Sequence, residues 1–153
     1  MANLTIAITK SDVLKEVAKT TAYIGGKSVD NSGKSLYDQV FVTDTDKAML
    51  ERFFLESTGT LRNLLKRFDI SETASSDGNI SWVLSMPSSY DTKLNTSIKN
   101  SCVSFFVNSI IAKWCEITVN EKTKEYQENA LALLEDIKDK VFYKKKPSRK
   151  SIN

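Results

Sequence analysis

The sequence predicts a mainly helical fold, with a four-helix core, one inserted β-hairpin and an extended N-terminal arm. Four long segments repeat apolar residues every three or four positions, which is the period of an amphipathic helix. Two other segments, near the N-terminus and near residue 80, alternate apolar and polar residues, which is the period of a strand. The 153 residues are enough for one domain, which we place at 1–143, followed by a basic, flexible C-terminal tail over 144–153.

The N-terminal segment NLTIAIT has the alternation of an extended strand or arm. Its apolar residues on one side are Leu4, Ile6 and Ile8. A first helix is predicted over about residues 11–24. We expect Gly25 and Gly26 to end that helix, because glycine readily takes the left-handed conformation found at helix C-termini.

The stretch GGKSVDNSGKS, residues 25–35, contains Gly-Lys-Ser twice, which is the second half of a nucleotide-binding P-loop. A P-loop also needs a glycine five positions earlier, where this chain has Thr21 and Ser28. We therefore interpret the stretch as a polar loop. Because it is longer than most connections in compact domains, we expect it to be mobile or ordered by a partner. Lys27 and Lys34 are its candidate partner contacts.

A second helix is predicted over about residues 44–68. Thr43 and Asp46 have the spacing of a capping box, with aspartate in place of the usual glutamate. Gly59 lies in the middle of this helix and weakens it by about 1 kcal/mol relative to alanine. We expect a kink or a close helix crossing there.

Residues 69–86 change to a period of two around Asp77-Gly78, which predicts a β-hairpin. Trp82 and Leu84 share one face of its second strand. Two strands alone are marginal in water, so this strand needs a surface to lie on. We favour a partner contact, such as the N-terminal arm of a neighbouring subunit. The alternative is that the hairpin caps the core of its own chain.

The third and fourth helices are predicted over about residues 91–118 and 120–143. The middle of the third helix is apolar nearly all the way round, which indicates burial on several sides. In a small chain, such burial leads us to expect cover from a neighbouring subunit. Cys102 and Cys115 fall on this helix, about 20 Å apart at about 1.5 Å per residue, so they cannot pair. We expect both cysteines to be buried and to pack as small hydrophobic residues.

The positive charge is concentrated at the C-terminus. The formal net charge is +3, and without the five basic tail residues the chain has 17 basic against 19 acidic residues. Lysine and arginine side chains of the tail can neutralise DNA phosphates or face an acidic protein surface. A disordered tail that aids solubility is the alternative. The basic tail residues are Lys144, Lys145, Lys146, Arg149 and Lys150.

The sequence offers no recognisable catalytic or metal-binding set. It contains no histidine, which is the commonest general base and metal ligand. No Gly-x-Ser-x-Gly motif occurs, and the carboxylates fall mostly on polar helix faces. We therefore expect neither enzyme activity nor a cofactor. The longest apolar run is too short and too polar to span a bilayer, and the N-terminus has no secretory signal pattern.

Two similarities suggest a class of protein. The segments ITKSDVLKEVAKTTAYIGGK and YDQVFVTDTDKAMLERFFLE are similar to small proteins encoded among the structural genes of tailed phages of gut anaerobes. This similarity covers mainly residues 6–56. The predicted element order resembles that of the head–tail connector (adaptor) proteins of tailed phages. Those are compact helical subunits that form a ring beneath the portal.

The resemblance implies a virion structural protein in the phage neck, present in the host cytoplasm before assembly. It implies a cyclic homo-oligomer that binds the portal protein and other neck or tail proteins, with non-specific contact to DNA in the channel. The alternatives are a DNA-associated accessory or tail-completion protein that uses the basic tail, and a small enzyme. The candidate contact residues are Leu4, Ile6, Ile8, Lys27, Lys34, Trp82, Leu84, Lys144, Lys145, Lys146, Arg149 and Lys150.

Overall fold

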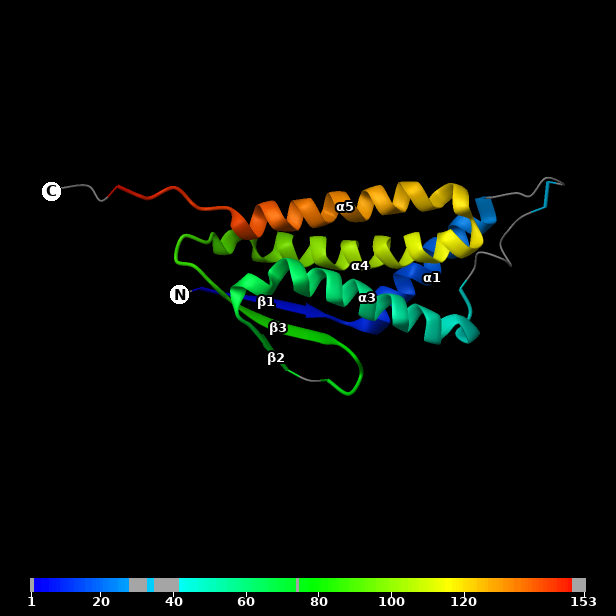
Figure 1. Cartoon of the computed structure of the whole chain (residues 1–153), viewed down its shortest axis with the longest axis horizontal. Helices are drawn as coiled ribbons and strands as arrows, with labels where there is room; N and C mark the ends of the chain where they lie inside the picture. Colours follow the sequence, from blue (N-terminus) through cyan, green and yellow to red (C-terminus); the bar gives the residue numbers. More distant parts are fainter. Residues whose placement is uncertain (1, 28–32, 35–41, 74, 150–153) are drawn as a thin grey trace.

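A computed structural model describes residues 2–27, 33–34, 42–73 and 75–149 of the chain. Four long helices, α1, α3, α4 and α5, lie beside a small antiparallel sheet (Figure 1). The predicted fold class, a mainly helical core with an inserted hairpin, is confirmed. Most of the polar loop that follows residue 27 lies outside the described residues.

The sheet has three strands, β1 (Ala2–Ile8), β2 (Ile70–Glu72) and β3 (Ile80–Met86), in the order β1-β3-β2. The predicted hairpin is confirmed, because β2 pairs with β3 in antiparallel register. The N-terminal arm pairs along its whole length with β3 of the same chain. The predicted extended segment at the N-terminus is confirmed as a strand, whereas our expectation that the hairpin strand pairs with a neighbour's arm is wrong. The arm supplies the third strand that a marginal two-stranded hairpin lacks.

One face of this sheet carries the core and the other is polar. Along β1 the buried residues alternate with partly or fully exposed ones, and the register places each buried residue opposite a buried residue of β3. This period of two is what strand geometry requires of a sheet with one covered face. The buried residues on the covered face are Leu4, Ile6, Ile8, Ile80, Trp82, Leu84 and Met86.

The first helix, α1 (Lys10–Lys27), continues through both glycines that we expected to end it. Neither Gly25 nor Gly26 is among the described residues with positive φ. The prediction is wrong because glycine can adopt the left-handed conformation that ends a helix but is not forced to adopt it. Gly25 is also buried beside Ile24, so the last turn belongs to the packed part of the helix.

The second predicted helix consists of α3 (Lys47–Leu65) with the 3-10 turns η1 (Asp44–Asp46) and η2 (Lys66–Phe68) at its ends. The backbone N–H of Thr43 donates to Oδ2 of Asp46 at 2.9 Å, which is one half of the predicted capping box. The helix passes through Gly59 without a break. Apart from its chain neighbours and the backbone of its own helix, no described atom lies within 4 Å of a Cβ built there, so the expected close crossing is absent.

The two C-terminal helices are α4 (Asn95–Thr118), preceded by the turn η3 (Thr92–Leu94), and α5 (Asn120–Phe142). Helix α4 packs against α5, α3, α1 and β1, so it lies at the centre of the fold (Figure 1). Its nearly continuous apolar surface is covered mostly within the chain. The expected additional cover by a neighbouring subunit stays a prediction. Cys102 and Cys115 on this helix are buried free thiols, as predicted.

Candidate functional site

The apolar candidate contacts from the N-terminal arm and the hairpin lie inside the chain. Their side chains are at most 2% exposed, because the covered face of the sheet packs beneath the helices. They stabilise the fold and do not present a surface to a partner. The predicted partner contacts that this burial contradicts are Leu4, Ile6, Ile8, Trp82 and Leu84.

The basic candidates lie at the surface but do not form one site. Lys27 ends α1, with its Nζ 5.7 Å from the centre of the Tyr23 ring, and Lys34 is exposed. The C-terminus of α1 and the basic tail lie at opposite ends of the molecule (Figure 1). The tail residues Lys144, Lys145, Lys146 and Arg149 are exposed, and Lys150 lies outside the described residues.

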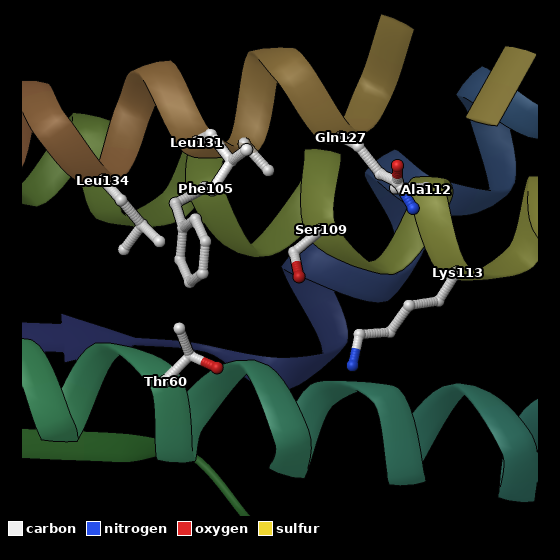
Figure 2. A pocket seen from close by; sticks show the side chains of 9 residues that line it. Thr60, Phe105, Ser109, Ala112, Lys113, Gln127, Leu131 and Leu134 are labelled. Atoms are coloured by element: carbon white, nitrogen blue, oxygen red, sulfur yellow. The ribbon is translucent and has the colours of Figure 1, made fainter. Parts of the chain in front are cut away.

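An apolar groove lies over α4, between α3 and α5 (Figure 2). Its volume is about 310 Å³. The floor comes from α4, one wall comes from α3, and the opposite wall comes from α5. We call this the α3–α5 groove. It is lined by Thr60, Phe105, Ser109, Ala112, Lys113, Gln127, Ala130, Leu131 and Leu134.

The α4 floor of the groove combines two small residues, Ser109 and Ala112, with the larger Phe105 and Lys113. Ser109 and Ala112 leave the floor low between the two flanking helices. Leu131 lies on the α5 wall and is 63% exposed, although leucine is usually buried. Apolar residues of α5 at helical spacing, Leu133 and Leu134 among them, form a stripe that packs against the core, and Leu131 falls outside it. That off-stripe leucine is the sequence signal that could have located the groove.

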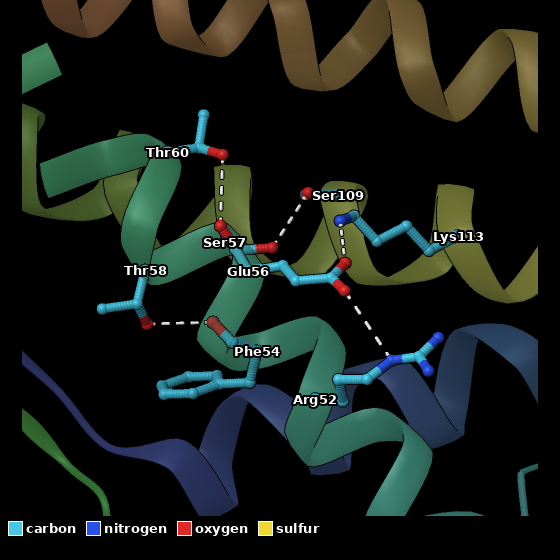
Figure 3. Close-up of polar contacts among 8 residues, drawn as sticks. All are labelled: Arg52, Phe54, Glu56, Ser57, Thr58, Thr60, Ser109 and Lys113. Atoms are coloured by element: carbon cyan, nitrogen blue, oxygen red, sulfur yellow. Dashed lines mark hydrogen bonds and ion pairs between the residues drawn. The ribbon is translucent and has the colours of Figure 1, made fainter. Parts of the chain in front are cut away.

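One end of the groove is polar (Figure 3). The Lys113 ammonium donates to the Glu56 carboxylate, and Arg52 Nε lies 3.6 Å from the other Glu56 oxygen. The hydrogen bond from Lys113 is the main reason that the pKa of Glu56 is lowered. Ser57 Oγ donates to Ser109 Oγ at 2.9 Å across the α3–α4 contact. Because these groups are engaged with one another, the groove offers apolar contact and not an activated nucleophile.

A second polar cluster joins α4 to α5. Ser101 Oγ donates to Asp136 Oδ2 at 2.7 Å, and Lys140 Nζ donates to the same oxygen at 2.6 Å and to Ser101 Oγ at 3.0 Å. A serine beside a lysine resembles a nucleophile with its base, but that base must be a neutral amine. Here the lysine is held in an ion pair with Asp136, and its hydrogen bond is the main reason that the pKa of Asp136 is lowered. We interpret the cluster as a link between two helices.

Within the described ranges, no group of three or more acidic or cysteine side chains could hold a metal ion. The helices of those ranges include none that is long and apolar enough to cross a membrane. Comparison of the chain with protein-family models, with curated proteins and with solved structures gives no match.

Proposed function

We propose that this protein is a structural subunit of a tailed-phage neck, a head–tail connector that joins copies of itself into a ring between portal and tail. The similarity of residues 6–56 and the order of the elements support this proposal. The single observation that carries it is the α3–α5 groove, whose apolar wall at Leu131 is left open by the rest of the described chain.

A ring with head-to-tail contacts needs two different complementary surfaces on each subunit. The groove is one candidate surface, with Phe105 and Ala112 in its floor and Leu131 on its rim. Leu55 and Tyr23 lie outside the groove, and each is 68% exposed. Single exposed apolar residues are ordinary on a monomer, whereas a continuous apolar hollow is typical of binding sites. The groove is therefore the surface to perturb first.

Particle composition tests the proposal. Particles purified from a lysate in which this gene is expressed should contain the protein at a small fixed ratio to the portal subunit, measured by quantitative mass spectrometry. Absence of the protein from purified particles would overturn the proposal. A monomer in solution is compatible with it, because a template can concentrate ring subunits that do not associate alone.

A matched pair of variants tests the role of the groove. Leu131→Glu places a charge on the apolar wall of the groove. We expect incorporation of this variant into particles to fall about tenfold or more, because a loss of about 1.4 kcal/mol of binding free energy already lowers affinity tenfold. Ala132→Glu places the same charge on the next residue of α5, which is exposed outside the groove lining. We expect normal incorporation of that control. Equal incorporation of both variants would exclude the groove as the inter-subunit contact.

A further inference from the structure

Basic side chains from three separate parts of the chain gather at one end of the molecule. The C-terminus of α3 with η2, the N-terminus of α4, and the C-terminus of α5 with the tail all lie at this end (Figure 1). We call it the basic end and define it as residues 66–69, 91–93 and 136–149. Its basic residues are Lys66, Arg67, Lys93, Lys138, Lys140, Lys144, Lys145, Lys146 and Arg149.

Ring contacts join η2 to the end of α5. The rings of Phe68 and Phe142 pack with their centres 5.3 Å apart. The Arg67 guanidinium lies 5.6 Å from the centre of the Phe142 ring. Residues separated by more than 70 positions in the sequence therefore form one continuous surface with the start of the tail.

The start of the tail is held against the body. Lys144 forms an antiparallel bridge with Tyr90, and the Lys145 N–H donates to the Ser89 carbonyl at 2.9 Å. Tyr90 itself is 1% exposed, so the bridge is anchored in the core. The side chains of Lys144 and Lys145 are exposed on a backbone whose position is fixed.

The charge of this end is far from balanced. It has nine basic and four acidic residues, whereas the rest of the chain has 13 basic and 15 acidic residues. Of its four carboxylates, Asp136 is engaged by Lys140 and Ser101. The others are Asp69, Asp91 and Asp139. Such an imbalance concentrates positive potential where a polyanion can approach.

Helix dipoles explain only part of this arrangement. Cations in the last turn of a helix are favourable, which accounts for Lys140 in α5 and for Lys66 and Arg67 after α3. The dipole effect is lost within about one turn. It therefore does not account for Lys146 and Arg149, which follow the end of α5 by four and seven residues.

We propose that the basic end binds the phosphodiester backbone of a nucleic acid without reading its sequence. Lysine side chains spread over several elements match a chain of evenly spaced phosphates, and each contact releases counterions. Phe142 and Tyr143 beside them are 38% and 50% exposed, which adds aromatic surface of the kind that stacks on unpaired bases. This proposal extends the DNA contact that the resemblance implies to basic residues outside the tail. Its test measures binding by the protein alone, so its failure is distinct from failure of the neck role.

The test uses the full chain and a fluorescently labelled duplex of about 30 base pairs, with one of its strands as the single-stranded probe. Affinity is measured by anisotropy between about 50 and 200 mM salt. One variant removes two charges from η2 (Lys66→Gln with Arg67→Gln), and a second removes three from the tail (Lys144→Gln, Lys145→Gln and Lys146→Gln). The control, Lys122→Gln with Lys124→Gln, removes two exposed charges from the opposite end of α5. Circular dichroism confirms that each variant is folded.

We expect binding that weakens steeply with salt. On the duplex, each lost phosphate contact should reduce the slope of log affinity against log salt concentration by about 0.9 in magnitude. The slope of the η2 variant should therefore fall by up to about 2, and that of the control should be unchanged. A preference for the single strand that Tyr143→Ala abolishes would identify unpaired nucleic acid as the ligand, and equal affinity would identify the backbone alone. The proposal would be overturned if the protein did not bind the duplex at low salt, or if the η2 variant bound as tightly as wild type. It would also be overturned if the control variant bound as weakly as the η2 variant. Equally strong competition by polyglutamate would overturn it too, because it would indicate an acidic protein.

Discussion

Ile6 lies directly opposite Trp82 across the β1–β3 pair, and neither side chain is exposed to solvent. The N-terminal strand is thus a structural part of the core. Its inward residues meet those of β3 on the face that the helices cover. Cross-strand pairs of an aromatic and a β-branched residue are among those that stabilise sheets.

Truncating Ile6 should destabilise the whole domain. Ile6→Ala removes buried methyl and methylene groups and leaves a cavity, so we expect the free energy of unfolding to fall by about 2–5 kcal/mol. Thr5→Ala on the exposed face of the same strand should cost less than about 1 kcal/mol. Urea unfolding of both variants provides the comparison. Similar small losses for the two would mean that β1 is not docked on β3.

The two thiols should be inert in the folded protein. Burial raises the pKa of Cys102 to about 12 and that of Cys115 to about 11. The thiolate is the reactive form, so at pH 8 we expect labelling by a thiol reagent to be about a hundredfold or more slower than in denaturant. Labelling kinetics with and without denaturant measure this ratio. Two thiols that react at the denatured rate would show that α4 is not buried.

The Ser101–Asp136–Lys140 cluster should contribute modestly to stability at neutral pH. A carboxyl group whose native pKa is lowered stabilises the fold above its ordinary pKa, near 4, and loses that contribution as the pH falls through the native value. Because the Asp136 side chain is 42% exposed, we expect Asp136→Asn to cost only about 0.5–1 kcal/mol at pH 7. The difference in free energy of unfolding between the variant and wild type, measured by urea titration, should become smaller below about pH 4. Asp139→Asn on the same helix is the control, and an equal loss for it at pH 7 would contradict a specific role of Asp136.

Two glycines should respond to alanine with opposite signs. Gly78 has φ +75°, and an added Cβ would also lie 3.0 Å from Lys10 Nζ, so Gly78→Ala should lower stability by about 1–2 kcal/mol. Gly59 lies in the exposed middle of α3 with open space around it, so Gly59→Ala should raise stability by about 1 kcal/mol. Thermal unfolding of the two variants gives the comparison. A lower stability of Gly59→Ala than of wild type would contradict the open space around this residue.

Helix positions could be predicted because apolar periodicity is a local property. The predicted ranges 44–68, 91–118 and 120–143 agree with the structure to within about one turn. Strand pairing is not local. The alternation of Leu4, Ile6 and Ile8 predicts one covered face, but it does not say which strand lies alongside. The pairing within the chain therefore had to come from the structure.

The two surfaces depend on packing that the sequence does not reveal. The α3–α5 groove combines residues of three helices, so only Leu131 could have hinted at it. The basic end needs the contact between Phe68 and Phe142 to bring Arg67 near the tail. The sequence indicated only the tail itself, which follows from a local run of lysines.

Imaging of the portal vertex in purified particles by cryo-electron microscopy tests the proposed neck role most directly. We predict a ring of subunits between portal and tail, each with four long helices and a three-stranded sheet, and with the α3–α5 groove of one copy occupied by its neighbour. A vertex that contains no such ring, or that places this fold elsewhere on the particle, would contradict the assignment to the neck.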